Sequence, residues 1–360
     1  MITELEIQNF RGLRHAKLAG LKSVNLIVGG NDTGKTSILE ALVLLLGDGS
    51  ALRNLPVTFR TNQSGGQSDE GNDRENFWSW LFYDRSPDNK IAIRAGVLHK
   101  TIEGVNSDET ITVVTEQKPD PHVGDNQLQP ILMRKDSRSS TESLRNMRKV
   151  NTGLVQFGVH QFSVIGGNPP DGFRLAVLST RAPNPVQDAE NYNQVALLAD
   201  GERRIEEIMR EIEPRVRRLR YAKLPGTTSP LIFVDLGLSR AVPATQMGQA
   251  FNRILHIYTH VLANRANVLL VDEIENGIFS ESMPKIWKGL FSLCEREGVQ
   301  IFATTHSREC VMAAHEAEKE RGKEELSVQR LQAVNGQVEA VSLASTHLEV
   351  ASEMGLEVRS

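Results

Sequence analysis

The sequence predicts an α/β fold, and two runs of residues carry that prediction. The first is the run from Gly29 to Thr36 (GGNDTGKT), which fits the phosphate-binding pattern G-x-x-x-x-G-K-[ST] in full. The second is the apolar stretch 267–271, which reads as a short strand and ends in Asp272 and Glu273. A strand, glycine-rich loop and helix, followed later by a strand ending in carboxylates, are typical of a P-loop NTPase.

The segments on either side of the glycine-rich run fit a P-loop. Apolar residues 24–28 precede it and predict a buried strand, and residues 36–46 follow it and predict a helix that ends at Gly47. The glycines let backbone N–H groups close around an anion, and the helix N-terminus adds partial positive charge. A chance glycine turn between a strand and a helix is the alternative, and the full motif in this context argues against it.

The residues of the loop have different expected tasks. Lys35 is expected to reach the β- and γ-phosphates of ATP, and the Thr36 hydroxyl to hold Mg²⁺. The whole run and the residue after it are therefore expected to contact the nucleotide: Gly29, Gly30, Asn31, Asp32, Thr33, Gly34, Lys35, Thr36 and Ser37.

The strand that ends in Asp272 and Glu273 has the pattern of a Walker B strand. We expect Asp272 to bind the Mg²⁺ shell and Glu273 to orient or deprotonate the attacking water, because hydrolysis needs a base close to the γ-phosphate. Apolar strands ending in Asp-Glu are common, so the Walker B interpretation depends on the P-loop earlier in the chain.

A third segment follows at a plausible spacing. Residues 299–303 predict another buried strand, and the polar run Thr304–Ser307 ends it. A histidine at the tip of the strand after Walker B can contact the γ-phosphate, so His306 joins Lys35 and Glu273 as an expected catalytic residue. A loop histidine at a strand end is common alone; the order of the three segments carries the prediction.

These segments resemble those of the compact ABC-type ATPases that include RecF, the SMC proteins and the OLD (overcoming lysogenization defect) family. The N-terminal strand of that group often reads Ile-x-Asn-Phe-Arg-Gly, and residues 7–12 match it. The resemblance implies that Arg11 contacts the nucleotide. The run 272–277 is similar to the Walker B and D-loop segment of the OLD-like branch, and His306 to its switch histidine.

The segment 243–249 (PATQMGQ), before an apolar helix, resembles a weak version of the ABC signature. The resemblance implies that Thr245, Gln246 and Gly248 contact the nucleotide of a second protomer, in a homodimer that ATP closes. The chain departs from the family pattern in three ways. It lacks Leu-Ser-Gly-Gly-Gln, Phe279 stands where the OLD-like run often has a histidine, and no Q-loop glutamine can be placed, although Gln63 and Gln67 are available.

The resemblance implies a single ABC-type ATPase domain over residues 1–360, with a mixed central sheet, an antiparallel β-lobe and an inserted helical subdomain. The interval between the P-loop and Walker B is too short for the coiled-coil arms of SMC proteins. No Asp-x-Asp pair of a Toprim nuclease occurs, so we expect a stand-alone ATPase. The expected parts are 1–50 with the P-loop, 51–130 as β-lobe and loops, 131–230 as a basic and helical arm, 231–315 with signature, Walker B and switch histidine, and 316–360 as C-terminal strands and helix.

Composition agrees with a globular cytoplasmic enzyme. The 360 residues are 39% hydrophobic and 24% charged, and the net charge of −4 argues against wholesale coating of nucleic acid. Cys294 and Cys310 lack metal-ligand spacing and are expected to be buried thiols in a reducing compartment. The N-terminus lacks the features of a signal peptide, and no apolar stretch approaches the ~20 residues of a membrane span.

Three segments each allow a structural and a functional interpretation. The aromatic cluster 78–83 either packs into the core or stacks nucleobases. The basic segments 133–149 and 215–220 are either solvated surfaces or contacts to DNA phosphates or a partner. An amphipathic helix is expected over 199–220, interrupted at Pro214.

Two function classes therefore remain open. One is an ATPase in DNA repair or phage defence that acts on DNA or on a separately encoded effector protein. The other is a regulatory ATP switch or scaffold that never touches nucleic acid. A transporter motor is a weaker third, because the signature is weak and no membrane segment is visible. Turnover that DNA stimulates, with a steep salt dependence, would favour the first class.

Overall fold

The computed structural model describes most of the chain. The described residues are 1–59, 80–86, 88–100, 106–119, 128–138, 149–157, 162–164, 169–178, 184–224, 226, 229–334, 337–343 and 347–350. Several segments discussed above lie outside these ranges: the polar loop with Gln63 and Gln67, Trp78, residues 139–148 of the first basic segment and the last ten residues.

A six-stranded mixed sheet forms the centre of the molecule, as predicted. Its strand order is β16-β15-β3-β14-β13-β9; β16 is antiparallel to β15, and the other neighbours are parallel. The strands are β3 (Val24–Gly29), β9 (Leu175–Leu178), β13 (Val268–Val271), β14 (Gln300–Thr305), β15 (Leu326–Val334) and β16 (Gln337–Leu343). β3, β13 and β14 are buried along their whole length, which agrees with their largely apolar sequences.

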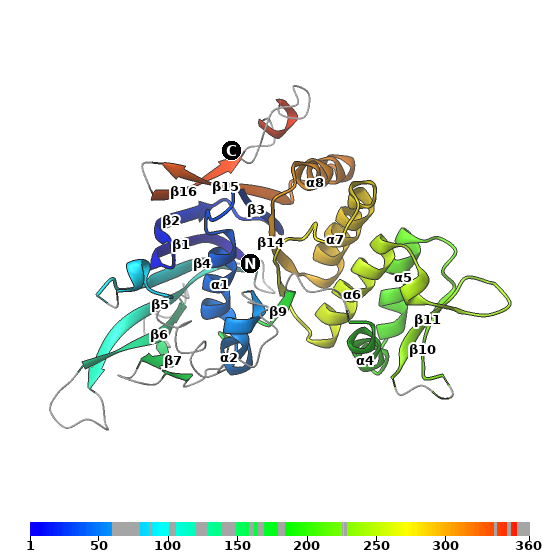
Figure 1. Ribbon diagram of the computed structural model, residues 1–360, viewed down its shortest axis with the longest axis horizontal. Coiled ribbons are helices and arrows are strands. Elements are labelled where there is room, and N and C mark those ends of the chain that lie inside the picture. The colour runs from blue at the N-terminus through cyan, green and yellow to red at the C-terminus, as the bar shows by residue number, and fades with distance from the viewer. Residues whose placement is uncertain are drawn as a thin grey trace, which may run out of the picture.

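The two faces of the central sheet contribute to two different cores. Along β3, Leu26 and Val28 belong to the core under the helices, whereas Ile27 belongs to the core under the second sheet. Helix α1 (Lys35–Leu46) lies between the central sheet and the second sheet (Figure 1) and contacts strands of both. Because α1 is covered on all sides, nearly every one of its residues is buried.

The second sheet is the antiparallel β-lobe. Its order is β2-β1-β4-β5-β6-β7-β8, with β1 (Ile2–Phe10), β2 (Leu13–Ala19), β4 (Ala92–Lys100), β5 (Asn106–Pro119), β6 (Leu128–Arg138), β7 (Lys149–Phe157) and β8 (Phe162–Val164). The strand order extends across the boundary expected at residue 130. Strands β6, β7 and β8 continue the lobe by hydrogen bonding to one another and to β5, so these three strands belong to the lobe rather than to the inserted arm.

Helices cover the other face of the central sheet, and a small three-stranded sheet packs against two of these helices, beyond them from the central sheet (Figure 1). The helices are α4 (Pro185–Ala196), α5 (Gly201–Ile212), α6 (Gln249–Ala263), α7 (Met283–Glu297) and α8 (Arg308–Arg321), and α2 (Gly49–Thr58) follows α1. The small sheet contains β10 (Arg218–Ala222), β11 (Leu231–Asp235) and β12 (Val242–Pro243), and single 3-10 turns occur as η1 (Tyr83–Arg85), η2 (Ala244–Gln246) and η3 (Ser280–Ser282).

The predicted amphipathic helix is shorter than expected. Helix α5 buries its apolar face and ends at Ile212, just before Pro214. The basic residues after Pro214 therefore lead into strand β10 rather than covering a helix face, and β10 buries Leu219 between exposed arginines.

Other expectations concern side chains of the core. Leu81 and Phe82 are buried, whereas Trp80 is about half exposed and its ring is covered by the guanidinium of Arg85. Both cysteines are buried and free, and burial raises the pKa of both thiols. None of the helices in the described part of the chain is long and apolar enough to cross a bilayer.

A buried ion pair fastens the β1–β2 hairpin to helix α1. The guanidinium of Arg11 donates to both carboxylate oxygens of Glu40, at 2.9 and 3.0 Å, and both side chains are buried. We expect Glu40→Ala to lower the free energy of unfolding by about 3–5 kcal/mol, because it removes the carboxylate that pairs with a buried guanidinium. Chemical denaturation measures this loss. The control is Glu4→Ala, whose exposed pair with Lys17 should contribute less than about 1 kcal/mol; equal losses in the two variants would contradict the prediction.

Candidate nucleotide-binding site

The three segments selected from the sequence meet at one edge of the central sheet. Strands β3, β14 and β13 are adjacent and parallel, so their carboxyl ends lie side by side. The P-loop follows β3, the polar run with His306 follows β14, and Asp272 with Glu273 follows β13. This edge of an open parallel sheet is where ligands bind in α/β folds.

The P-loop backbone requires glycine at two positions. Gly29 and Gly34 have φ angles of 153° and 87°. A Cβ added at Gly29 would lie 2.6 Å from the backbone oxygen of Leu331, and one at Gly34 would lie 2.7 Å from a methyl carbon of Leu13. The loop is therefore held closely between β15 and the β1–β2 hairpin, with Gly34 at the N-terminus of α1.

Lys35 is folded back over the loop. Its Nζ donates hydrogen bonds to the backbone oxygens of Gly29 (3.0 Å) and Gly30 (2.6 Å), and the residue is 6% exposed. Burial lowers the pKa of Lys35, while the nearby negative charges of Asp272, Glu273 and Glu275 oppose that shift. The ammonium group thus lies between the loop carbonyls and a group of carboxylates.

Asp272 accepts hydrogen bonds from two hydroxyl groups. The Thr304 hydroxyl donates to its Oδ1 at 2.6 Å, and the Thr36 hydroxyl donates to the same oxygen at 3.3 Å. Burial raises the pKa of Asp272 and the charge of Glu273 adds to this effect, whereas the hydrogen bonds from Thr304 and Thr36 oppose it. The structure therefore joins the P-loop threonine directly to the Walker B aspartate.

The pair Thr36 and Asp272 fits a Mg²⁺ ion. Both provide hard oxygen atoms, and Mg²⁺ is usually held by one or two carboxylates, waters and substrate phosphates rather than by an all-protein cage. Among the described residues no group of three or more His, Cys, Asp or Glu side chains could hold a metal by itself. A metal at this position would depend on oxygen ligands from the substrate.

Glu273 and His306 face each other across the site. The Nε2 of His306 lies 3.8 Å from Oε1 of Glu273, and the two side chains are 37% and 41% exposed. Glu273 has a φ angle of 47°, unusual for a residue with a side chain, and its backbone N–H donates to the Thr304 hydroxyl at 2.8 Å. A hydrogen bond to β14 thus holds the expected catalytic base in an unusual backbone conformation.

Arg11 occupies a different environment from the one expected. The resemblance assigns it a nucleotide contact, but its side chain is buried in the ion pair with Glu40 described above. Its backbone N–H donates to the oxygen of Leu81 at 2.8 Å. A direct contact to nucleotide therefore stays a prediction, and the structure shows a role in fastening the hairpin beside the P-loop.

The signature segment lies at the start of α6. Thr245, Gln246 and Gly248 are exposed, and Gly248 is the residue that precedes the helix. No hydrogen bond or ion pair connects this segment with the P-loop, and both lie wholly within the described residues. The side chain of Gln249 instead accepts a hydrogen bond from the backbone N–H of Phe279, at 3.3 Å, in the loop after Walker B.

Sequence reasoning missed several polar residues of the site. Thr304 was recognised only as part of a polar strand end, yet it contacts both Walker B carboxylate residues. Glu275 accepts a hydrogen bond from the backbone N–H of His306. These hydrogen bonds form only when β13 and β14 pair, and the two strands are separate in the sequence. The position of Thr304 close to His306 is the one sequence feature that points to the site.

Removal of the Thr304 hydroxyl is expected to weaken metal dependence. In Thr304→Val the side chain keeps its shape, but Asp272 and the Glu273 backbone each lose a hydrogen bond. We expect the Mg²⁺ concentration for half-maximal ATPase activity to rise about 10–100-fold, as is typical when a residue that orients a metal ligand is lost. Titration of activity with Mg²⁺ measures this, with Thr305→Val as the control; an unchanged midpoint would contradict the role given to Thr304.

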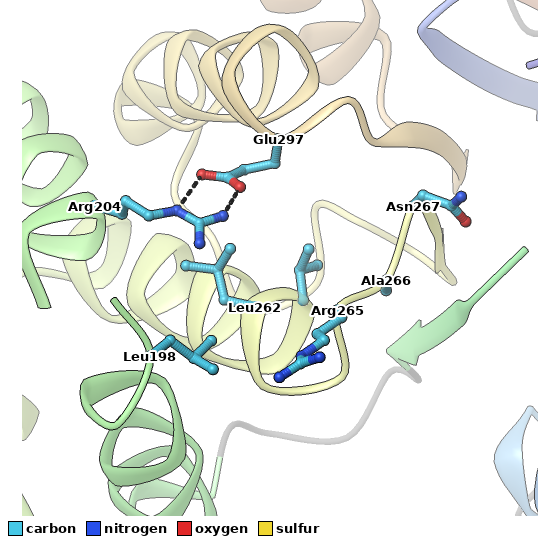
Figure 2. Close-up of a pocket in the computed structure, with 8 residues that line it drawn as sticks. Leu198, Arg204, Leu262, Arg265, Ala266, Asn267 and Glu297 are labelled. Carbon is cyan, nitrogen blue, oxygen red and sulfur yellow. Dashed lines mark hydrogen bonds and ion pairs between the residues drawn. The ribbon is translucent and has the colours of Figure 1, made fainter. Parts of the chain in front are cut away.

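A separate pocket of about 360 Å³ lies at the opposite end of β13, between α5, α6 and α7. Figure 2 shows Arg204 of α5 reaching Glu297 at the end of α7, with Nε and Oε1 3.1 Å apart. Asn267, on the same wall, precedes β13, whereas Asp272 follows that strand. This pocket is therefore remote from the site at the carboxyl ends of the strands.

Comparisons with known proteins agree with this geometry. Residues 24–311 match the family model described as "AAA domain, putative AbiEii toxin, Type IV TA system". The chain is 22% identical over 330 residues to the ATP/GTP phosphatase of Helicobacter pylori, covering 86% of each protein. It is 38% identical over 108 residues to the DNA replication and repair protein RecF of Edwardsiella ictaluri, covering 28% of this chain and 30% of RecF.

Among solved structures, the SMC head bound to the C-winged helix domain of ScpA matches with a TM-score of 0.48 and 12% identity, covering 97% of this chain and 99% of that chain. The family match includes the P-loop, Walker B and the polar run with His306, whose positions at one sheet edge were described above. The chain thus belongs to this AAA-domain family and is an ATPase.

Proposed function

We propose that the protein is a Mg²⁺- and ATP-dependent dimerisation switch whose two composite sites each use residues of both protomers. The observation that carries this proposal is the exposed signature segment at the start of α6, which has no polar contact with the P-loop of its own chain. A segment that is needed at the γ-phosphate but lies apart from it in its own chain can act on a second copy.

The chain's own residues would divide the work as follows. The P-loop amides and Lys35 bind the phosphates, while Thr36 and Asp272 hold the Mg²⁺ ion that accompanies ATP. Glu273 takes the proton of the attacking water. His306 lies beside Glu273 and would contact the γ-phosphate. Thr245, Gln246 and Gly248 of a second protomer complete the site.

ATP would then act through a difference in affinity between two states. Contacts to the γ-phosphate from both protomers stabilise the closed dimer, and hydrolysis removes them. The two buried free thiols fit a reducing, cytoplasmic compartment.

The switch is proposed to act on DNA or on a separate effector protein, in DNA repair or in an OLD-like defence role. The exposed arginines on β10, Arg218 and Arg220, support a contact to phosphates. Two basic residues of the same segment are already paired, Arg215 with Glu213 and Arg220 with Asp235, which supports the alternative of a regulatory switch without nucleic acid.

Complementation between two inactive variants tests the composite site. Lys35→Ala damages the P-loop, and Gly248→Glu places a charge on the signature surface, where an added Cβ meets no atom within 4 Å. In a mixed dimer both defects fall on one site, so the other site is intact. We expect ATPase activity to reappear on mixing.

The controls are each variant alone at the same total concentration, both of which should stay inactive. If the mixture is also inactive while both proteins are folded, the site does not use two protomers and the dimer proposal fails. Turnover measured with and without duplex DNA, at low and high salt, then separates the two output classes, because phosphate contacts give a steep salt dependence.

A further inference from the structure

Helix α6, which begins at the signature segment, contacts the loop after Walker B at its first turn. The side chain of Gln249 accepts from the backbone N–H of Phe279 at 3.3 Å. One turn later, Arg253 lies close enough to Glu275 to be affected by its charge. Residues four apart share one face of a helix, so this face of α6 is turned toward the loop 273–279.

Arg253 is an unusual residue for its position. It is 6% exposed, and its Nε has no hydrogen-bond partner among the described residues. Guanidinium groups are rarely buried without a partner, because the loss of hydration is costly. Such a group in a native protein calls for an explanation.

Glu275 has a complementary deficiency. Its Oε1 accepts a hydrogen bond from the backbone N–H of His306, at 2.5 Å, whereas its Oε2 is buried and has no partner among the described residues. No ion pair joins Arg253 and Glu275 in this structure, although both are described in full. Arg253 is buried on helix α6 and Glu275 is half-buried beside the site, and each of these oppositely charged residues therefore leaves a buried atom unpaired.

We propose that Glu275 is a positioning residue for His306 and that Arg253 controls it, so that displacement of the signature helix is transmitted to the γ-phosphate side of the site. A small shift of α6 toward the loop would join Arg253 to Glu275 and satisfy both unpaired atoms. Because the same carboxylate holds the His306 backbone, a change in its position moves the imidazole relative to Glu273, which lies 3.8 Å away.

This inference rests on the proposed dimer switch, in which a second protomer's nucleotide contacts the start of α6. It adds a route by which a contact at the start of α6 affects the catalytic site of the same protomer. In a dimer, nucleotide binding at one site would then affect the other site through the Arg253–Glu275 pair rather than through the P-loop.

A double-mutant cycle tests the route. The variants are Arg253→Met, which keeps the length of the side chain and removes its charge, Glu275→Gln, which can still accept from His306, and the combination. We expect each single variant to lower kcat about tenfold with the KM for ATP changed less than about twofold, and the double variant to fall no further than the worse single. Arg253→Lys should recover part of the activity.

The Arg204–Glu297 pair in Figure 2 provides a matched control, since it also links two helices but lies at the other end of β13. Arg204→Met and Glu297→Gln should leave kcat unchanged. Thermal unfolding verifies that every variant is folded; if Arg253→Met is not, the same cycle is made with Arg253→Lys and Glu275→Gln.

Two results would overturn the inference: unchanged kcat in a folded Arg253 variant, or losses that multiply in the double variant. Its failure is distinguishable from failure of the dimer proposal. If Lys35→Ala and Gly248→Glu complement each other but the Arg253–Glu275 losses multiply, only the route is wrong. If mixing restores nothing, the dimer itself is wrong, whatever the cycle gives.

Discussion

Glu273→Gln is expected to lower kcat by roughly 10²–10⁴-fold while ATP binding is retained, because it removes the general base and leaves the phosphate-binding groups in place. The amide is the same size as the carboxylate, and Glu273 is partly exposed, so the fold should not change. With hydrolysis blocked, the closed state persists, and light scattering should show a shift from monomer to dimer mass only when Mg·ATP is present.

The control for this experiment is Glu316→Gln, an exposed glutamate on α8 away from the site. Its turnover and mass should match those of the unmodified protein. If Glu273→Gln hydrolyses ATP at the normal rate, another group is the base. If it is inactive but its mass is the same with and without ATP, hydrolysis uses Glu273 but ATP does not control assembly.

Lys35→Ala is expected to weaken ATP binding about 10–100-fold and to abolish measurable turnover. A charge-assisted hydrogen bond to a phosphate is worth about 1.5–3 kcal/mol, and each 1.4 kcal/mol is a factor of ten in affinity. The loss should be larger for ATP than for ADP, because the lysine is expected at the β- and γ-phosphates. Titration with a fluorescent nucleotide analogue measures both affinities.

Lys22→Ala is the matched control, since Lys22 lies before β3, at the other end of the strand that leads into the P-loop, and is paired only loosely with Glu324, at 3.5 Å. Its nucleotide affinity should be normal. Lys35 also donates to the carbonyls of Gly29 and Gly30, so its loss could disturb the loop. Lys35→Arg distinguishes the cases: if it restores the loop contacts but not turnover, the lysine acts on the phosphate.

The local parts of the site were predictable because each is encoded within a few residues. The P-loop needs glycine at fixed positions, a preceding apolar strand and a following helix, and all three are adjacent in the chain. The same holds for the strand before Asp272 and for the strand before His306. Their order along the chain and the family resemblance together predicted the mixed sheet.

Contacts between distant segments were not predictable in the same way. The resemblance predicts a nucleotide contact for Arg11, whereas its pairing with Glu40 depends on how the hairpin packs on α1. Membership of β6 in the β-lobe follows from its pairing with β5, which the sequence around residue 130 does not reveal. The sequence of one strand does not show which residues of other strands its polar side chains will contact.

The sequence alone identified the groups of the expected nucleotide site, an amine, a hydroxyl and two carboxylates, and placed them on an α/β sheet. Tertiary structure decided how these groups are connected. Thr304 links Asp272 to Glu273, Glu275 holds His306, and the start of α6 contacts the loop after Asp272 through Gln249 and Phe279. The physical reason is that hydrogen bonds and charge pairs act over a few ångströms in space, and chain folding alone brings residues that are 30 or more positions apart within that range.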